Sequence, residues 1–274
     1  MARALSASSL RTLHQCAEKF RRRYLDQEPS RPSGAMLVGS AAGAAANATD
    51  HHYIEHGEFL TPEATLDRFS DEWDLEVEEK GSEVRESGEE LGALKDATAG
   101  ALSDYLAQLD ALPRPIAVER EARVEVDGVP FVAYMDREQE DGSIADRKVK
   151  GKRLSQADAD ADSQATAYLA VRQVESLDGL AGEPTGFEFH TLIRQKTKRY
   201  AEVVPTERTG DQLDDFLTRI YRAAEEIEWR TQTGNWSYAA DGSWWCSEKF
   251  CDFWAACPGG GKLRRVADEA VSAE

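Results

Sequence analysis

The sequence predicts an α/β fold, and three observations indicate it. Apolar residues recur at helical spacing through most of residues 1–112. Beyond Pro113 and Pro115 apolar and polar residues alternate instead, as is typical of β-strands. A helical stretch at about 155–174 then separates these strands from two further ones. Because 274 residues with 41% hydrophobic content can bury a sizeable core, we expect a single domain over 1–274.

The first part of the chain is expected to be helical. The four expected helices span about 6–24, 35–56, 61–80 and 88–111. Ser6 or Ser8 can cap the first of them, because a serine hydroxyl accepts from the free N–H groups of a first turn. The second contains a run of small residues from Gly39 to Ala46, which suits close packing against a neighbouring element. The third and fourth are strongly acidic on one face, which predicts solvated surfaces.

Turn signals divide the second part into strands and helices. Asp127-Gly128 and Asp141-Gly142 mark two tight turns in a β-meander. Downstream, the pattern predicts a helix at about 155–174, strands at 187–193 and 200–204, and a long helix at about 211–231. We therefore divide the expected domain into a mainly helical part at 1–112, an α/β core at 113–205 and a C-terminal part at 206–274.

Charge and hydropathy limit the kinds of partner that the chain can have. The net charge of −18 argues against general affinity for nucleic acid, because phosphate binding depends on clustered Lys and Arg. Basic residues nevertheless cluster at Arg21–Arg23, Lys148–Arg153 and Arg194–Arg199. No segment approaches the roughly 20 apolar residues of a membrane span, and the first residues lack the apolar stretch of a signal peptide. The expected location is the cytoplasm, without a membrane partner.

The second turn brings candidate catalytic residues onto one hairpin. Residues two apart on a strand share a face, so Asp146 and Lys148 are expected to point the same way. A two-residue loop would place Asp136 opposite Arg147. A three-residue loop at 140–142, with its glycine in the left-handed region, would place Asp136 opposite Asp146. A metal site needs the second register, and we predict it.

Two carboxylates at this separation repel each other unless a cation lies between them. Mg²⁺ is the natural candidate, because it prefers hard oxygen ligands and keeps waters for catalysis. Lys148 would then lie beside an attacked phosphate, and Gln164 and Tyr168, four positions apart, share one helix face toward it. The alternative is that Asp136, Asp146 and Lys148 are ordinary surface residues of a hairpin, since an isolated Asp-x-Lys is common by chance.

Four cysteines raise the question of a second metal centre. Disulfides are not expected in the cytoplasm. Cys246, Cys251 and Cys257 form a Cys-x4-Cys-x5-Cys pattern, and Cys16 lies far upstream. This spacing is wider than in zinc knuckles and better fits a loop around an iron-sulfur cluster. Zinc, or four unrelated buried cysteines, are the alternatives.

Several motifs occur in a defined order along the chain. They are SxxxLxxxxxCxxKFxxxY from Ser6 to Tyr24, Ala133-Tyr134-Met135-Asp136, Asp146-Arg147-Lys148-Val149-Lys150, Gln164 to Tyr168, and the terminal cysteine triplet. Taken together they resemble the RecB-like branch of the PD-(D/E)XK nuclease superfamily, which includes the iron-sulfur exonucleases of CRISPR systems, the AddB nuclease domain and many phage exonucleases. No single motif is specific, but the resemblance covers nearly the whole chain.

The resemblance implies a restriction-endonuclease-like core, a mixed β-sheet flanked by helices, and a metal-dependent DNA exonuclease. It implies that Asp136, Asp146 and the backbone carbonyl of Arg147 bind Mg²⁺ or Mn²⁺, and that Lys148 activates the water. Gln164 and Tyr168 would position the DNA strand or the lysine. It further implies a 4Fe-4S cluster on Cys16, Cys246, Cys251 and Cys257, which joins the N-terminal and C-terminal segments.

The sequence departs from the family pattern at two places. Family members often carry a metal-binding histidine four residues after the glycine that matches Gly39, and here that position is Gly43. The Thr-Gly that follows the catalytic lysine is replaced by Val149-Lys150. The rival interpretation is a non-catalytic DNA-binding or assembly subunit that keeps the fold. The missing histidine favours it, and the retained Asp-x-Lys opposes it.

The expected partner is DNA, as ends or single strands, together with a helicase or recombination partner. Four basic residues are candidates for contacts to backbone phosphates: Arg194, Lys196, Lys198 and Arg199. An ordinary solvated loop is the alternative for them. Phage recombination, host repair and CRISPR spacer handling are all compatible with the pattern.

Overall fold

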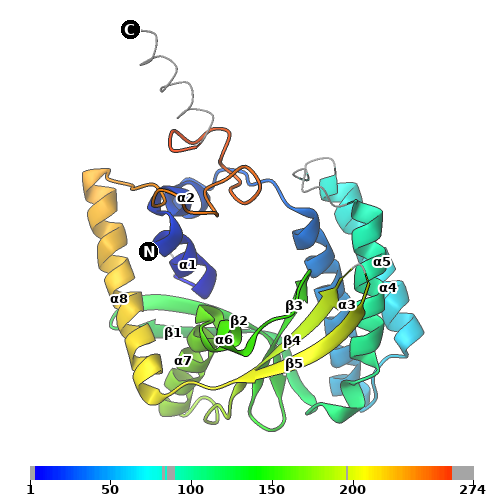
Figure 1. Ribbon diagram of the computed structural model, residues 1–274. Helices are drawn as coiled ribbons and strands as arrows, with labels where there is room; N and C mark the ends of the chain where they lie inside the picture. Colours follow the sequence, from blue (N-terminus) through cyan, green and yellow to red (C-terminus); the bar gives the residue numbers. More distant parts are fainter. Residues whose placement is uncertain (1–3, 82–83, 85–89, 196, 261–274) are drawn as a thin grey trace.

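The computed structural model describes residues 4–81, 84, 90–195 and 197–260, and its centre is one five-stranded sheet (Figure 1). The strands are β1 (Pro115–Val126), β2 (Val129–Gln139), β3 (Ile144–Lys150), β4 (Phe187–Arg194) and β5 (Arg199–Thr206), in this order across the sheet. β3 and β4 run parallel, and the other neighbours are antiparallel. The expected α/β fold with a mixed sheet is confirmed.

Helices surround the sheet on both faces. They are α1 (Ala7–Gln15), α2 (Ala17–Phe20), the π-helix η1 (Arg21–Leu25), α3 (Gly34–His56), α4 (Pro62–Lys80), α5 (Leu91–Leu106), the 3-10 turn η3 (Leu109–Ala111), α6 (Gln156–Asp160), α7 (Ser163–Leu177) and α8 (Gly210–Thr233). α6 and α7 form the crossover that two parallel strands require, since a tight turn cannot connect β3 to β4. This crossover carries Gln164 back over the end of β3.

Two hydrophobic clusters hold the helices onto the sheet. One face of the sheet packs against α1, α7 and α8, where Phe131 and Phe216 meet edge to face with 5.9 Å between ring centroids. The other face packs against α3, α4 and α5, with the fully buried Leu102 and Leu192 at its centre. Figure 1 shows the two groups of helices on either side of the sheet. The site described below lies on β2 and β3, with α3 on one side and α7 on the other.

Two expected helices are interrupted by residues whose side chains cap the next helix. Cys16 is extended, with φ −166°, and its sulfur accepts from the N–H of Lys19, so α1 ends and α2 begins there. Asp162 likewise separates α6 from α7, because its carboxylate accepts from the N–H groups of Gln164 and Ala165. Such caps satisfy the free donors of a first helical turn and outweigh the continuous helical pattern of the sequence.

The C-terminal segment returns to the N-terminal helices. After α8, residues 234–260 form a series of turns that lie beside α2 (Figure 1). The N–H of Glu18 donates to the carbonyl of Ser237 at 3.0 Å, and Trp245 Nε1 donates to the carbonyl of Gln15 at 3.2 Å. The two ends of the described chain are therefore joined through direct hydrogen bonds.

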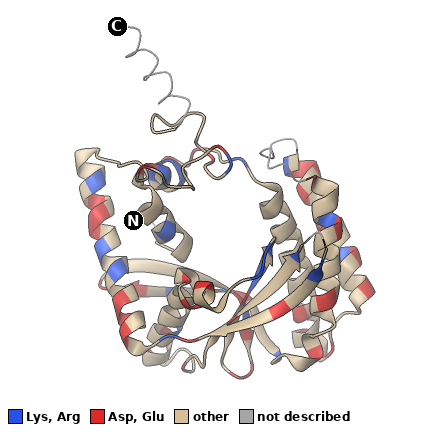
Figure 2. Cartoon of the chain, in the orientation of Figure 1, with Lys and Arg blue, Asp and Glu red and all other residues tan. Residues whose placement is uncertain are grey.

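Charge is distributed unevenly over the elements. Figure 2 shows acidic residues along α4 and α8, whereas basic residues mark β3 and the adjacent end of the sheet. The basic cluster expected around Lys148 thus lies on the sheet, although the whole chain is acidic. Among the residues that the structure describes, none of the helices has the length and apolar character that crossing a membrane requires.

Candidate active site

The β2–β3 hairpin has the register that a metal site needs. Arg137 pairs with Ala145 and Glu138 with Ile144, and Gln139 N–H donates to the carbonyl of Ser143 at 3.0 Å. Gly142 has φ +86°, so it takes the left-handed position of a three-residue turn. The expected register is confirmed.

One further step along this register places Asp136 level with Asp146. The regular pairing ends just before this point. The backbone N–H of Arg147 donates instead to Asp136 Oδ2 at 3.0 Å. A carboxylate therefore stands where a backbone carbonyl would continue the sheet, and it connects β2 to β3 at the point where their regular pairing stops.

Four of the predicted side chains form one connected hydrogen-bond group. Lys148 Nζ lies 2.7 Å from Asp146 Oδ2 and donates to Gln164 Oε1 at 2.8 Å. Gln164 Nε2 donates to Asp146 Oδ1 at 2.7 Å and to the hydroxyl of Tyr168 at 2.9 Å. The glutamine thereby fixes the carboxylate and the ammonium relative to each other. These side chains come from a strand and a helix that the crossover brings together.

Burial raises the pKa of both carboxylates, and a cation between them would favour their charged forms. Burial, and next the charge of Asp146, raise the pKa of Asp136 to about 7. Burial also raises the pKa of Asp146, which is 1% exposed, although Lys148 opposes this effect. A buried carboxylate pair loses hydration that one lysine replaces only in part. A hard divalent cation with oxygen ligands would supply the missing positive charge.

An open cleft of about 570 Å³ lies in front of these groups, between α3 and the sheet. Asp136 and Lys148 line its sheet side, and Gly39 and Gly43 line its helix side. A Cβ atom at either glycine would meet no atom within 4 Å. The small-residue run was expected to serve close packing. Its alanines do so, with Ala45 fully buried, but its glycines instead keep the cleft open.

A comparison with known protein families shows to which family this chain belongs. The family described as the PD-(D/E)XK nuclease superfamily matches residues 4–258. The chain belongs to this superfamily. The match spans both the hairpin and the cysteine segment, so the motifs seen in the sequence lie within one family alignment. The RecB-like iron-sulfur branch is a finer assignment than this match supports.

Two solved structures are similar to this PD-(D/E)XK nuclease. The crystal structure of a "Putative exonuclease" from Eubacterium rectale aligns with a TM-score of 0.53 and 15% identity, over 86% of this chain and 84% of that one. At this identity the likeness supports the fold alone. The structure of SSO0001 aligns over 88% of this chain and 93% of that one at 12% identity, and its TM-score of 0.32 carries no weight. The comparison with curated proteins found no match.

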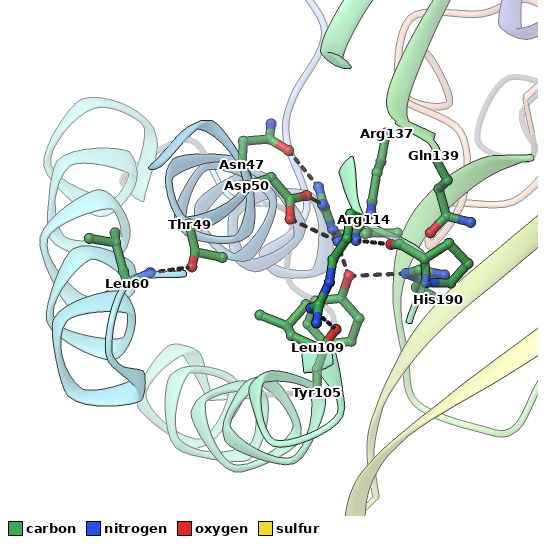
Figure 3. Close-up of polar contacts among 12 residues, drawn as sticks. Asn47, Thr49, Asp50, Leu60, Tyr105, Leu109, Arg114, Arg137, Gln139 and His190 are labelled. Carbon is green, nitrogen blue, oxygen red and sulfur yellow. Dashed lines mark hydrogen bonds and ion pairs between the residues drawn. The ribbon is translucent and has the colours of Figure 1, made fainter. Parts of the chain in front are cut away.

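A buried charge network behind the candidate site was missed in the sequence. Asp50 of α3 is fully buried and forms an ion pair with Arg137 at 2.8 Å (Figure 3). It forms a second ion pair with Arg147. Asn47 also accepts from the Arg147 guanidinium. α3 therefore holds Arg147, whose backbone N–H binds Asp136. The one available signal was the arginine between Asp146 and Lys148, because an arginine on a covered strand requires a buried acidic partner.

The same network extends to a buried histidine. The Tyr105 hydroxyl lies 3.0 Å from His190 Nδ1 (Figure 3). His190 Nε2 lies 3.0 Å from Glu188. His190 is fully buried. Burial lowers the pKa of His190 to about 4, and the charges of Arg137 and Arg147 act in the same direction, against the hydrogen bond to Glu188. The ring is therefore neutral at neutral pH.

This histidine predicts a loss of stability in mild acid. Because its pKa is depressed in the folded state, the unfolded chain binds the proton more tightly. The free energy of unfolding should therefore fall by about 3 kcal/mol as the pH is lowered from 6.5 to 4, because the unfolded chain takes up the proton and the folded His190 does not. Urea midpoints measured from pH 7.5 to 4 should fall more steeply for the wild type than for His190→Gln. Parallel curves for the two proteins would contradict this prediction.

The basic residues proposed for DNA contacts lie at the β4–β5 turn. Arg194 and Arg199 are paired across this hairpin, and Lys198 Nζ lies 4.6 Å from the centre of the Tyr200 ring. Lys196 lies outside the described residues. Lys148 pairs with Thr191 on the parallel strand β4, so Arg194 follows three residues further along, or about 10 Å. The turn is thus at the same end of the sheet as Lys148.

All four cysteines line one small cavity between α2 and the C-terminal segment. Burial raises the pKa of the Cys16 and Cys257 thiols. In the described part of the chain, no three Cys, His, Asp or Glu side chains already converge as ligands of a single metal ion.

The aromatic residues around the cysteines differ in how far they are buried. The Phe253 side chain is buried against the cavity. Trp244 is 64% exposed, and Phe250 is 43% exposed and meets it edge to face at 4.8 Å. Part of the aromatic set therefore faces solvent.

Proposed function

We propose that this chain is a metal-dependent DNA exonuclease that acts on DNA ends or single strands. The observation that carries the proposal is the contact of Asp146 with Lys148 and Gln164, at 2.7 Å each, beside Asp136 on the open cleft. The superfamily match supports phosphodiester hydrolysis as the reaction class. The cleft is open toward solvent and lined by small side chains on one side, which suits the approach of a nucleic acid strand.

The protein side of the mechanism follows from the contacts. Asp136, Asp146 and the carbonyl of Arg147 would hold Mg²⁺ or Mn²⁺, which supplies positive charge to the phosphate and acidifies a bound water. Lys148 is held in place by its ion pair with Asp146 and by its hydrogen bond to Gln164. Its ammonium can orient the attacking water and stabilise the negative charge that develops on the phosphate. No large movement is needed to bring it to the cleft, which it already lines.

Tyr168 acts through Gln164 rather than on the DNA. Burial raises the pKa of its hydroxyl well above the ordinary value, so it stays protonated. It accepts from Gln164 Nε2, which also donates to Asp146. The tyrosine thereby sets the rotamer of the glutamine, and the glutamine sets the distance between Asp146 and Lys148. We propose both as positioning residues.

A cleavage assay tests the proposal. Anaerobically purified protein is incubated with Mn²⁺ or Mg²⁺ and end-labelled linear DNA, single-stranded and duplex, beside covalently closed circular DNA. We expect shortening of linear DNA that EDTA abolishes, while the circle stays intact. Nicking of the circle would indicate an endonuclease. An inert protein would support the rival proposal of a DNA-binding or assembly subunit, which the missing side chain at Gly43 favours.

We further propose that Cys16, Cys246, Cys251 and Cys257 bind a 4Fe-4S cluster with a structural role. Their common cavity supports this. The N–H of Lys19, which donates to the sulfur of Cys16, partly offsets the burial that raises the pKa of this thiol. The cluster would reinforce the hydrogen bonds that already join the C-terminal segment to the N-terminal helices.

The cluster proposal predicts a coloured protein. Anaerobic preparations should contain about four iron and four sulfide per chain and absorb broadly in the visible range. Cys257→Ser should lose most of this absorbance and melt at a lower temperature. A matched substitution in the same segment, Ser247→Ala, should change neither property, since the Ser247 hydroxyl donates to the local carbonyl of Trp244. Colourless protein that contains one zinc per chain would contradict the cluster.

A further inference from the structure

We propose that Glu119 of β1 is a third carboxylate ligand for the divalent cation. This inference rests on the proposed function. Glu119 lies on a strand that carries none of the motif residues. It would supply a metal ligand in place of the histidine that Gly43 replaces on α3. Glu119 and Asp136 are the two carboxylates that line the open cleft. Their placement follows from the sheet, as the next steps argue.

The register of β1 and β2 brings Glu119 level with Asp136. Val118 pairs with Arg137, and Arg120 pairs with Met135, so Glu119 lies between them opposite Asp136. Asp136 in turn lies level with Asp146 on β3. The three carboxylates therefore come from three adjacent strands at one level of the sheet. Adjacent strands are about 4.8 Å apart, which is within the reach of side chains that share one ion.

Both strands lose their regular alternation at this pair. Met135 packs in the cluster under α1, α7 and α8, whereas Arg137 contacts Asp50 of α3 on the opposite face. Residues two apart share a face in a regular strand, so the alternation of β2 changes at Asp136. Glu119 has φ +48°, an uncommon conformation for a residue with a side chain. The irregularity turns both carboxylates toward the cleft.

The opposite wall of the cleft leaves room for the cation and its ligands. Gly39 and Gly43 of α3 line it, and a side chain at either position would enter open space. The Glu119 side chain is exposed, and within the described residues it has no hydrogen-bond or ion-pair partner that restrains it. It can therefore rotate toward the ion. Its charge already acts on Asp136, whose pKa it helps to raise.

Metal affinity tests this inference without relying on catalysis. Mn²⁺ binding is measured by calorimetry on the full-length protein without DNA. Glu119→Gln should weaken binding by about tenfold, an effect typical of losing one contributor to a metal site. Glu121→Gln is the matched control, because Glu121 is two residues along the same strand and pairs with the exposed Arg123. Its affinity should equal that of the wild type.

The metal dependence of DNA cleavage gives a second measurement. The Mn²⁺ concentration for half-maximal rate should rise in Glu119→Gln by the same factor as the dissociation constant. Both variants should keep the melting temperature of the metal-free wild type, since neither side chain is buried. Unchanged Mn²⁺ affinity in Glu119→Gln would overturn the inference. If the wild type itself bound no Mn²⁺, the proposed function would fail first, so the two failures are distinguishable.

Discussion

Asp146→Asn should lower the rate of DNA cleavage by at least about a thousandfold while leaving the fold intact. A bound cation contributes several kcal/mol of charge stabilisation, and each 1.36 kcal/mol is a factor of ten in rate. The asparagine keeps the shape of Asp146 and can still contact Gln164, whose amide donates to Oδ1 at 2.7 Å. It cannot supply the negative charge that holds the metal.

The same substitution should not destabilise the metal-free protein. Burial raises the pKa of Asp146, which means that the ionised carboxylate is less favourable folded than unfolded. Removing the charge removes this cost, so the melting temperature without metal should stay the same or rise. Mn²⁺ should raise the melting temperature of the wild type and have little effect on that of the variant. A structural residue would show the opposite pattern, with lower stability and normal metal dependence.

Asp158→Asn is the matched control for this prediction. Asp158 lies on the short helix α6, is exposed, and bonds to the adjacent Ser155. Its substitution should change neither the cleavage rate nor the response to Mn²⁺. Cleavage by Asp146→Asn at more than about a tenth of the wild-type rate would show that the hydrolytic centre lies elsewhere.

Asp50→Asn should destabilise the protein by about 3–5 kcal/mol, the largest stability effect that we expect of a single substitution. Asp50 and Arg137 are fully buried, and the Arg147 side chain is 5% exposed. Burial lowers the pKa of Arg147 to about 9, so its guanidinium is still charged at neutral pH. Without the carboxylate, two buried cations face each other uncompensated, and removing one partner of a buried pair typically costs this much.

Urea unfolding at pH 7.5 measures the effect of Asp50→Asn. Asp67→Asn, on the exposed face of α4, is the control and should change the free energy of unfolding by less than about 0.5 kcal/mol. We also expect weaker cleavage by Asp50→Asn, because Arg147 donates its backbone N–H to Asp136. A loss below about 1 kcal/mol would mean that Asn47 and the Pro113 carbonyl satisfy the two arginines without Asp50.

The local part of the site could be predicted because its residues are close in sequence. Gly142 and the lengths of β2 and β3 set the hairpin register, so the level of Asp136 and Asp146 followed from turn chemistry. The helical spacing of Gln164 and Tyr168 placed both on one face. The breaks at Cys16 and Asp162 were not predicted, because a side-chain cap interrupts a helix without changing its apolar pattern.

The sequence by itself determined the α/β class, the order of the strands along the chain and the hairpin that carries Asp146 and Lys148. These depend on periodicity and on turns of a few residues, which short-range sterics and hydrogen bonds decide. Only the tertiary structure decided that Asp50 neutralises Arg137 and Arg147, and that Glu119 and Asp136 line one cleft with α3. These contacts join distant segments, and their energies depend on burial and on the packing of α3 against the sheet, which no local pattern records.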